Sequence, residues 1–171
     1  KGKYKELLQA YLASISFADA MVGRLIDAVE QSRHADNTII VLWSDHGWHF
    51  GEKRHLHKFT LWERSTRIPF IVVAPGVTEP NTICDQPIGM IDLFPTLNAL
   101  CALPLVPSLD GQNIEPLLRD PEQHWNRPAL TTHGQGNHAV RSRQWRYIRY
   151  ADGGEELYDH SQDPNEWTNL A

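Results

Sequence analysis

The sequence predicts an α/β fold followed by a small antiparallel subdomain. Three observations predict it: a long amphipathic helical pattern over residues 4–31, continuously apolar β-branched segments at 38–43 and 68–74, and short aromatic segments after Pro128. A helix that leads into a buried strand is half of an α/β unit. The change to short segments separated by turn residues predicts two domains, 1–125 and 126–171.

The composition is that of a globular protein. The chain has 171 residues, 41% of them hydrophobic, and a formal net charge of −5. These values exclude a disordered tail and a collagen-like chain, and the acidic balance argues against a dedicated nucleic-acid binder. No apolar run reaches the roughly 18 residues of a membrane span. Two cysteines are too few for a disulfide framework.

The first half of the chain carries one helix and two strands. Apolar residues recur at three- and four-residue spacing over 4–31, which is typical of an amphipathic helix. The segments 38–43 and 68–74 do not alternate, so we expect strands buried on both faces, as in a parallel sheet. Pro69 is tolerable because the first position of a strand need not donate to the ladder.

The second half carries two short helices and a meander. Asp92 is the expected N-cap of a helix over 93–101, with Pro95 in its first turn. A shorter helix is expected around 114–119. Turn residues then separate four expected strands, at 129–132, 138–141, 144–150 and 156–159.

The most informative segment follows the first strand. Asp45 and His46 come directly after its carboxyl end, which is the edge where ligands bind in open α/β sheets. A carboxylate and an imidazole there can grip a metal ion, and Gly47 is expected to let the backbone turn sharply. The alternative is that Asp45 caps the turn and His46 is an ordinary hydrogen-bonded polar residue.

Positive charge is concentrated beside this candidate metal site. Residues 45–67 hold five Lys and Arg against three acids, and four of the nine histidines lie between His46 and His57. Such charge is expected around an anionic substrate, although a solvated basic loop is the simpler alternative. His55 and His57 have the spacing of a zinc pair but no cysteine partner nearby, which favours substrate contact or loop structure. A hard cation takes about six to eight ligands, so the others would come from outside the chain, water or substrate.

Several short motifs follow one another along nearly the whole chain. They are Ser44-Asp45-His46-Gly47 after the strand, Gly51-Glu52 followed by Lys58, Ala74-Pro75-Gly76, Asp92-Leu93-Phe94-Pro95, and Glu156-Leu157-Tyr158-Asp159 with Asp163-Pro164. In this order the motifs resemble the C-terminal portion of the type I sulfatases, within the alkaline-phosphatase-like superfamily. The nearest pattern is that of the iduronate-2-sulfatase-like and choline-sulfatase-like branch.

The resemblance implies a fold and a set of roles. The fold would be part of an alkaline-phosphatase-like mixed sheet sandwiched by helices. Asp45 and His46 would bind a divalent metal, usually Ca²⁺, and Lys58 would bind the sulfate and stabilise charge near the leaving oxygen. The partner would be a sulfated small molecule or carbohydrate, and a periplasmic or secreted location is implied. Trp48 and Phe59 would line the substrate pocket, with His57 and His138 as weaker candidates for substrate contact.

One departure from the family pattern is decisive. The family's nucleophile is a formylglycine made from Cys or Ser in a Cys/Ser-x-Pro-x-Arg motif. None of the eleven prolines here has Cys or Ser two positions before it. We therefore expect a C-terminal fragment that is inactive alone and self-associates through unpaired strands, with the nucleophile and the paired Asp ligands in a missing N-terminal part. The alternatives are a decayed non-catalytic relative, a phosphate or phosphonate monoester hydrolase of the same superfamily, and a non-enzymatic binding domain.

Overall fold

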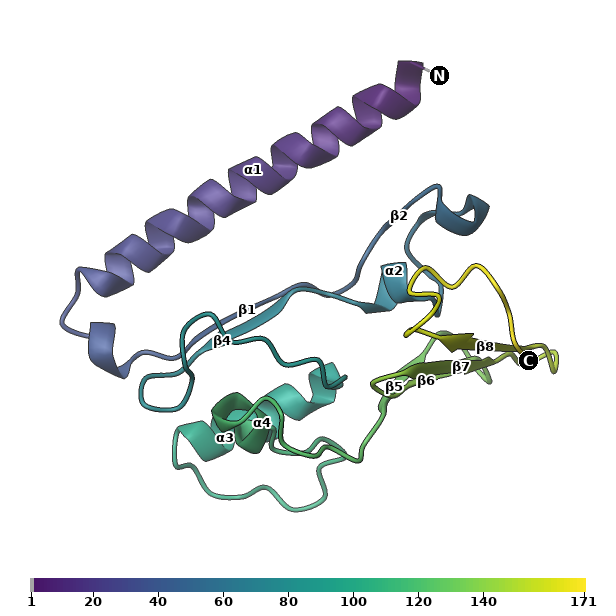
Figure 1. Cartoon of the computed structure of the whole chain (residues 1–171). Coiled ribbons are helices and arrows are strands. Elements are labelled where there is room, and N and C mark those ends of the chain that lie inside the picture. Colours follow the sequence, from purple (N-terminus) through teal and green to yellow (C-terminus); the bar gives the residue numbers. More distant parts are fainter. Residues whose placement is uncertain (1) are drawn as a thin grey trace. The chain divides into compact units, whose positions relative to one another are not determined.

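The computed structural model describes residues 2–171 (Figure 1). The chain forms two compact units that divide after Ile40. The domain boundary expected near residue 125 stays a prediction, although helices do give way to strands at that point of the chain.

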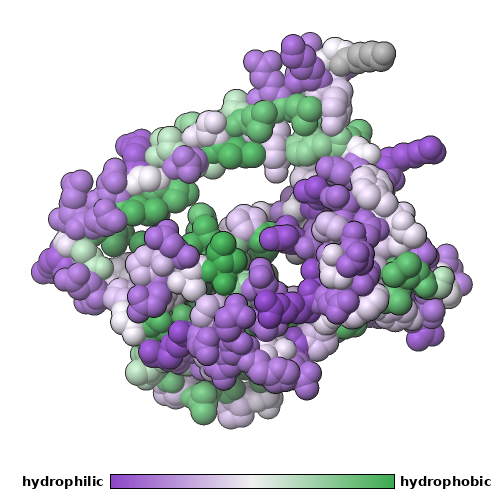
Figure 2. All heavy atoms as spheres, viewed as in Figure 1, coloured by the Kyte–Doolittle hydropathy of each residue, from purple (hydrophilic) through white to green (hydrophobic). Residues whose placement is uncertain are grey.

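The first unit consists mainly of one long helix. α1 (Gly2–Glu30) has 29 residues and is followed by the short 3₁₀ helix η1 (Ala35–Asn37), which confirms the expected helix to within two residues at each end. No residue of α1 is buried, and Leu12 and Leu25 are 62% and 67% exposed. Figure 2 shows hydrophobic residues, in green, along this helix. Helices gain most of their stability by packing such an apolar face. No helix within residues 2–171 is long and apolar enough to cross a bilayer.

The two expected core strands form and pair with each other. β1 (Ile40–Trp43) and β4 (Phe70–Val73) make a two-stranded sheet. Burial on both faces, however, was a wrong prediction: Trp43, Ile71 and Val73 are 49%, 53% and 49% exposed. Such burial needs strands on both sides and covering helices, and each strand has a single neighbour within the described residues.

Short elements between β1 and β4 carry the loop that the sequence singles out. β2 (His49–Phe50) and β3 (Leu56–His57) pair antiparallel as a small hairpin, with His49 opposite His57 and Phe50 opposite Leu56. The 3₁₀ helix η2 (Glu52–Arg54) forms the turn between them, and α2 (Glu63–Thr66) follows the hairpin.

Asp92 differs from its expected role. The 3₁₀ helix η3 (Met90–Asp92) runs into α3 (Leu93–Leu100), and α4 (Glu115–Arg119) follows. Asp92 has a helical backbone and caps nothing in α3. Its buried carboxylate instead accepts hydrogen bonds from the N–H groups of Gly89 and Gln112 and from the guanidinium of Arg127. A partnered buried carboxylate of this kind holds three chain segments together.

The expected antiparallel meander is confirmed. It is a four-stranded sheet in chain order, with Ala139 opposite Ile148 and Tyr147 opposite Leu157. Ala139, Ile148 and Tyr158 form a buried cluster with Leu61, which comes from the segment before α2. The meander therefore packs against the loop region that carries the candidate site. Its strands are β5 (Ala129–Thr132), β6 (His138–Arg141), β7 (Trp145–Arg149) and β8 (Glu155–Asp159).

The 171-residue chain is expected to self-associate. Ile71 on β4 is an exposed apolar side chain of a two-stranded sheet, so the mass obtained by sedimentation at micromolar concentration is expected to exceed the monomer mass of 19.5 kDa. The substitution Ile71→Glu is expected to shift sedimentation velocity profiles towards monomer. Leu105→Glu is the control, since Leu105 is 86% exposed and lies in a loop. A single monomeric species at every concentration contradicts the expectation.

Candidate functional site

The side chains of Asp45 and His46 converge just past the end of β1. Asp45 Oδ2 lies 3.4 Å from His46 Nε2. His46 Nδ1 lies 2.8 Å from the carbonyl oxygen of Gly47, and a carbonyl can only accept, so the proton sits on Nδ1. Nε2 therefore keeps its lone pair on the side facing the carboxylate, which is the arrangement a cation ligand needs.

The third group at this point is the Lys58 ammonium. Its Nζ lies 2.7 Å from His46 Nε2 and donates to that lone pair. The side chain of Asp45 is 82% exposed and that of His46 is 30% exposed. Together with Phe59, these residues line an open depression of about 1570 Å³. A carboxylate, an imidazole and an ammonium thus share one solvent-accessible spot.

Gly47 is needed for a reason other than the one expected. Its φ is outside the left-handed region, so it makes no special turn. Its N–H donates to the carbonyl of Ser65 at 2.8 Å, and a Cβ at this position would lie 2.0 Å from the carbonyl oxygen of Arg64. The glycine thus lets the strand end sit directly on α2, which fixes the position of Asp45 and His46.

The hairpin that delivers Lys58 is strained. Lys53 and Arg54 in its turn have φ values of 53° and 60°, and His57 and Phe59 on either side of Lys58 have 74° and 72°. Each non-glycine residue in this region costs about 1–2 kcal/mol. His55 donates from Nε2 to the carbonyl of Lys58 at 2.9 Å, which helps to hold the second strained stretch.

Trp48, His57 and Phe59 lie around the convergent groups. The Trp48 ring meets His57 edge-on at 5.0 Å between centroids and lies 6.1 Å from His46. Phe59 is 67% exposed, lies 5.3 Å from the Lys58 ammonium, and stacks on His133 at 5.8 Å. The sequence gives no sign of the role of His133, because a lone histidine after a strand carries no signal of a contact 74 positions away.

The structure does not bring together all of the histidines that the sequence singled out. His138 lies on β6, where its Nδ1 is 2.9 Å from Thr132 Oγ1, and it lines a separate depression of about 540 Å³. It is not brought to Lys58. His55 and His57 do not face a common point either, because His55 bonds to the Lys58 carbonyl and His57 packs on Trp48.

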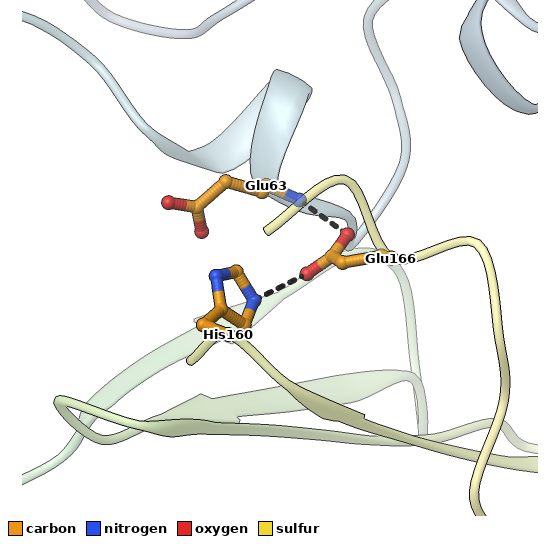
Figure 3. Close-up of side chains that lie close together, drawn as sticks. All are labelled: Glu63, His160 and Glu166. Carbon is orange, nitrogen blue, oxygen red and sulfur yellow. Dashed lines mark hydrogen bonds and ion pairs between the residues drawn. The ribbon is translucent and has the colours of Figure 1, made fainter. Parts of the chain in front are cut away.

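A second cluster joins α2 to the C-terminal tail. Ligand atoms of Glu63, His160 and Glu166 all lie within 4.8 Å of one another, the one such group of three or more among residues 2–171. Figure 3 shows that Glu63 reaches Glu166 through its backbone N–H, which donates to Oε2 at 2.9 Å, while His160 Nε2 lies 2.9 Å from Oε1. The spacing alone would suit a metal ion.

Arginines already occupy the carboxylates of this cluster. Arg146 Nε lies 2.6 Å from Glu166 Oε1, and both Arg146 and Arg141 pair with the Glu63 carboxylate. Burial raises the pKa of Glu63, but Arg146 and Arg141 lower it by more, so the net pKa is below its usual value. We interpret the cluster as an ion-pair network that ties α2, β7 and the tail together, because a cation here would have to displace buried guanidinium groups.

Comparison with known sequences gives a consistent family. The sulfatase family model matches residues 1–102. A sulfatase from Formosa agariphila is 42% identical over 170 residues, which is 99% of this chain and 33% of that protein. Arylsulfatase K from Canis lupus familiaris is 31% identical over 188 residues, covering 100% of this chain and 35% of its own length. The chain therefore spans about a third of the curated relatives it matches.

Solved structures show the same partial coverage. BT4656 in complex with its substrate D-glucosamine-2-N,6-O-disulfate matches with a TM-score of 0.84 and 25% identity, over 94% of this chain and 35% of that one. The phosphonate monoester hydrolase of Agrobacterium radiobacter matches with a TM-score of 0.74 and 26% identity, over 92% and 35%. The expected alkaline-phosphatase-like fold is confirmed by these neighbours.

The close approach at Gly47 generates a stability prediction. Gly47→Ala places a methyl group against the Arg64 carbonyl, so the free energy of unfolding is expected to fall by about 1–3 kcal/mol in urea denaturation. Gly23→Ala is the matched control, because nothing lies within 4 Å of a Cβ there and alanine favours the helix by about 1 kcal/mol. An unchanged unfolding midpoint for Gly47→Ala would show that α2 can shift away from the added methyl group without loss of stability.

The ion-pair network generates a pH prediction. The pKa of Glu63 is lowered by folding, so its contribution to stability is present above the ordinary value of 4.5 and is lost as pH falls through the folded pKa. Glu63→Gln is expected to cost about 3 kcal/mol at neutral pH and to flatten the acid limb of a stability-versus-pH curve. Glu122→Gln, whose side chain is 76% exposed, is the control and should change neither. If the acid limb of Glu63→Gln matched that of the wild type, the ion pairs of Glu63 would not be the source of the pH-dependent stability.

Proposed function

This chain belongs to the sulfatase family, and from that premise we propose that it forms the C-terminal part of a sulfuric ester hydrolase. The observation that carries the proposal is the convergence of Asp45, His46 and Lys58 on one exposed point. The proposal concerns the longer protein, since the chain spans about a third of its relatives.

Asp45 and His46 are the proposed ligands of a divalent cation, Ca²⁺ by family resemblance. The fit rests on the tautomer: the Gly47 carbonyl holds the proton on Nδ1, so Nε2 carries a lone pair 3.4 Å from a carboxylate oxygen. That lone pair accepts from Lys58 in this structure, and the ammonium would turn from Nε2 towards the substrate when a cation binds. The remaining ligands of such a site would come from outside these residues. When bound, the cation supplies Lewis-acid stabilisation of the charge on a sulfate ester.

Lys58 is the proposed sulfate-binding residue. An ammonium has three N–H donors. One points to His46 Nε2 in this structure, and with a cation on Nε2 all three would be available to oxygens of the sulfate and of the leaving alcohol. Negative charge on the leaving oxygen grows as the S–O bond breaks, and a positioned ammonium stabilises that charge more than it stabilises the ground state. The nucleophile, a formylglycine by resemblance, is proposed to come from the N-terminal part of the longer protein.

The substrate proposed is a sulfated small molecule or carbohydrate. Phe59 stacked on His133 offers a flat, exposed surface beside the ammonium, and Trp48 lies next to both His46 and His57. Rings of this kind suit the apolar face of a sugar or an aryl group. Support also comes from BT4656, whose substrate is a sulfated glucosamine. His138 remains a proposed contact only for a substrate that extends to β6.

A second candidate is a phosphonate or phosphate monoester hydrolase of the same superfamily. It is favoured by the structural match to the Agrobacterium radiobacter enzyme. An ammonium and a cation site would serve a phosphoryl group by the same electrostatics, so the described residues suit either anion.

The role of Lys58 is tested in the longer protein. Lys58→Met is expected to lower kcat for 4-nitrophenyl sulfate by about 10²–10³-fold, because one preorganised donor to the developing charge is lost. Arg54→Met is the matched control, since Arg54 is an exposed cation on the same hairpin. Full activity of Lys58→Met would exclude the assignment.

Two further assays complete this test. The wild-type protein is expected to have a higher kcat/KM for the sulfate than for a 4-nitrophenyl phosphonate monoester, and the reverse order would favour the second candidate. The isolated 171-residue chain is expected to show no turnover of either ester.

A further inference from the structure

The hairpin that carries Lys58 is tethered at its far end by Lys53. The Lys53 side chain is only 14% exposed, although it sits in a turn. Its Nζ donates to the hydroxyl of Tyr158 at 2.7 Å and to the carbonyl of Glu166 at 2.6 Å. It also lies 4.5 Å from the centroid of the Trp62 ring and 4.4 Å from that of Tyr158. A buried ammonium between two aromatic faces is an anchor, since cation–π contacts gain strength when water is excluded.

The anchor is built on one carboxylate. Glu156 accepts hydrogen bonds from Trp62 Nε1 and the Tyr158 hydroxyl, both at 2.6 Å, and from the Tyr150 hydroxyl at 3.1 Å. Its Oε2 lies 4.0 Å from Lys53 Nζ. Burial lowers the pKa of Lys53, and the charges of Glu156 and Glu166 oppose that effect. Glu156 therefore holds the Trp62 and Tyr158 rings in place, and it supplies a counter-charge for the ammonium. The two rings and this carboxylate form an aromatic cage around Lys53.

The hairpin needs such an anchor. It has two residue pairs in its ladder, and a two-stranded hairpin is marginally stable by itself. Four of its residues in and after the turn have left-handed backbones, a conformation that persists only where the surroundings hold it.

A continuous set of contacts leads from the anchor to Lys58. The Trp62 ring that faces Lys53 also packs edge-on against His55, at 6.2 Å between centroids. His55 bonds to the Lys58 carbonyl at 2.9 Å, and Lys58 Nζ reaches His46 at 2.7 Å. The His49 ring packs edge-on against both His55 and Trp62, and burial, followed by the neighbouring His55, lowers its pKa.

We propose that Lys53 is a positioning residue, whose buried ammonium fixes the hairpin on the four-stranded sheet and thereby places the Lys58 ammonium at His46. Its value for catalysis rests on the proposed function of Lys58, while the positioning itself does not. Lys53 contacts the sheet through Tyr158 and the C-terminal tail through Glu166.

The test measures geometry in the 171-residue chain and requires no turnover. In Lys53→Met, which keeps an unbranched side chain and removes the charge, the NMR cross-peaks between the Lys58 ε-methylene and the His46 ring are expected to disappear. Hydrogen exchange of the Gly51 and His55 amides, which close the hairpin turn, is expected to accelerate at least tenfold. Cross-strand peaks between Ala139 and Ile148 should persist and show that the sheet is intact. Arg54→Met, which removes a neighbouring exposed cation, should leave all of these signals unchanged.

A second variant keeps the proposal falsifiable if Lys53→Met disturbs the sheet. Tyr158→Phe retains the ring and removes one acceptor of the Lys53 ammonium, so it is expected to accelerate His55 exchange by a smaller factor. The double variant should exchange no faster than Lys53→Met alone, because both act on one contact. Retained Lys58–His46 cross-peaks in Lys53→Met, or unchanged His55 exchange in Tyr158→Phe with its sheet intact, overturn the proposal. If the longer protein hydrolyses no sulfate ester, the proposed function fails while these signals still decide the role of Lys53.

Discussion

The hydrogen bond from the Lys58 ammonium to His46 Nε2 is the contact around which the other features are arranged. It requires an imidazole whose proton is on the opposite nitrogen, and the Gly47 carbonyl provides that. It requires the end of β1 to lie against α2, which the missing Cβ of Gly47 permits. It also requires a strained hairpin to present its lysine in one direction. The ammonium and the imidazole share this point with the carboxylate of Asp45, whose side chain is largely exposed.

The structure contains two groups of potential metal ligands, and comparing them shows what distinguishes a site from a network. Glu63, His160 and Glu166 have suitable spacing, yet their acceptor atoms face Arg146, Arg141 and backbone N–H groups. Asp45 and His46 offer only two ligand atoms, but those atoms face an open depression. A cation at Asp45 and His46 would displace only the Lys58 ammonium from Nε2 at a solvent-accessible point, whereas a cation at the first group would displace buried guanidinium groups, so the second pair is the better candidate.

Sequence alone predicts the elements well where the signal is local. The bounds of β5 and β6 and the type of every long element follow from periodicity and turn residues, and Asp45 and His46 are adjacent in the chain. Prediction from sequence fails where the burial or the role of a residue depends on residues that are distant in the chain. The exposure of Trp43 depends on what covers the sheet, and the role of Asp92 depends on Gln112 and Arg127. The partners of Lys53 lie 105 and 113 positions away, so its aromatic cage leaves no trace in the basic loop that contains it.

Two shortfalls occur at the same edge of the molecule, and one explanation accounts for both. Ca²⁺ takes about six to eight ligands, and Asp45 and His46 supply two. A core strand of an α/β sheet has neighbours on both sides, and β1 has β4 alone within the described residues. If only the cation ligands were missing and the sheet were complete, Asp45 and His46 would be the remains of a lost site on an intact domain. In the proposed longer protein, a further strand beside β1 would lie at the edge where Asp45 and His46 lie, and it is the proposed source of the remaining ligands of the cation. The relatives, about three times as long as this chain, contain enough additional residues to do both.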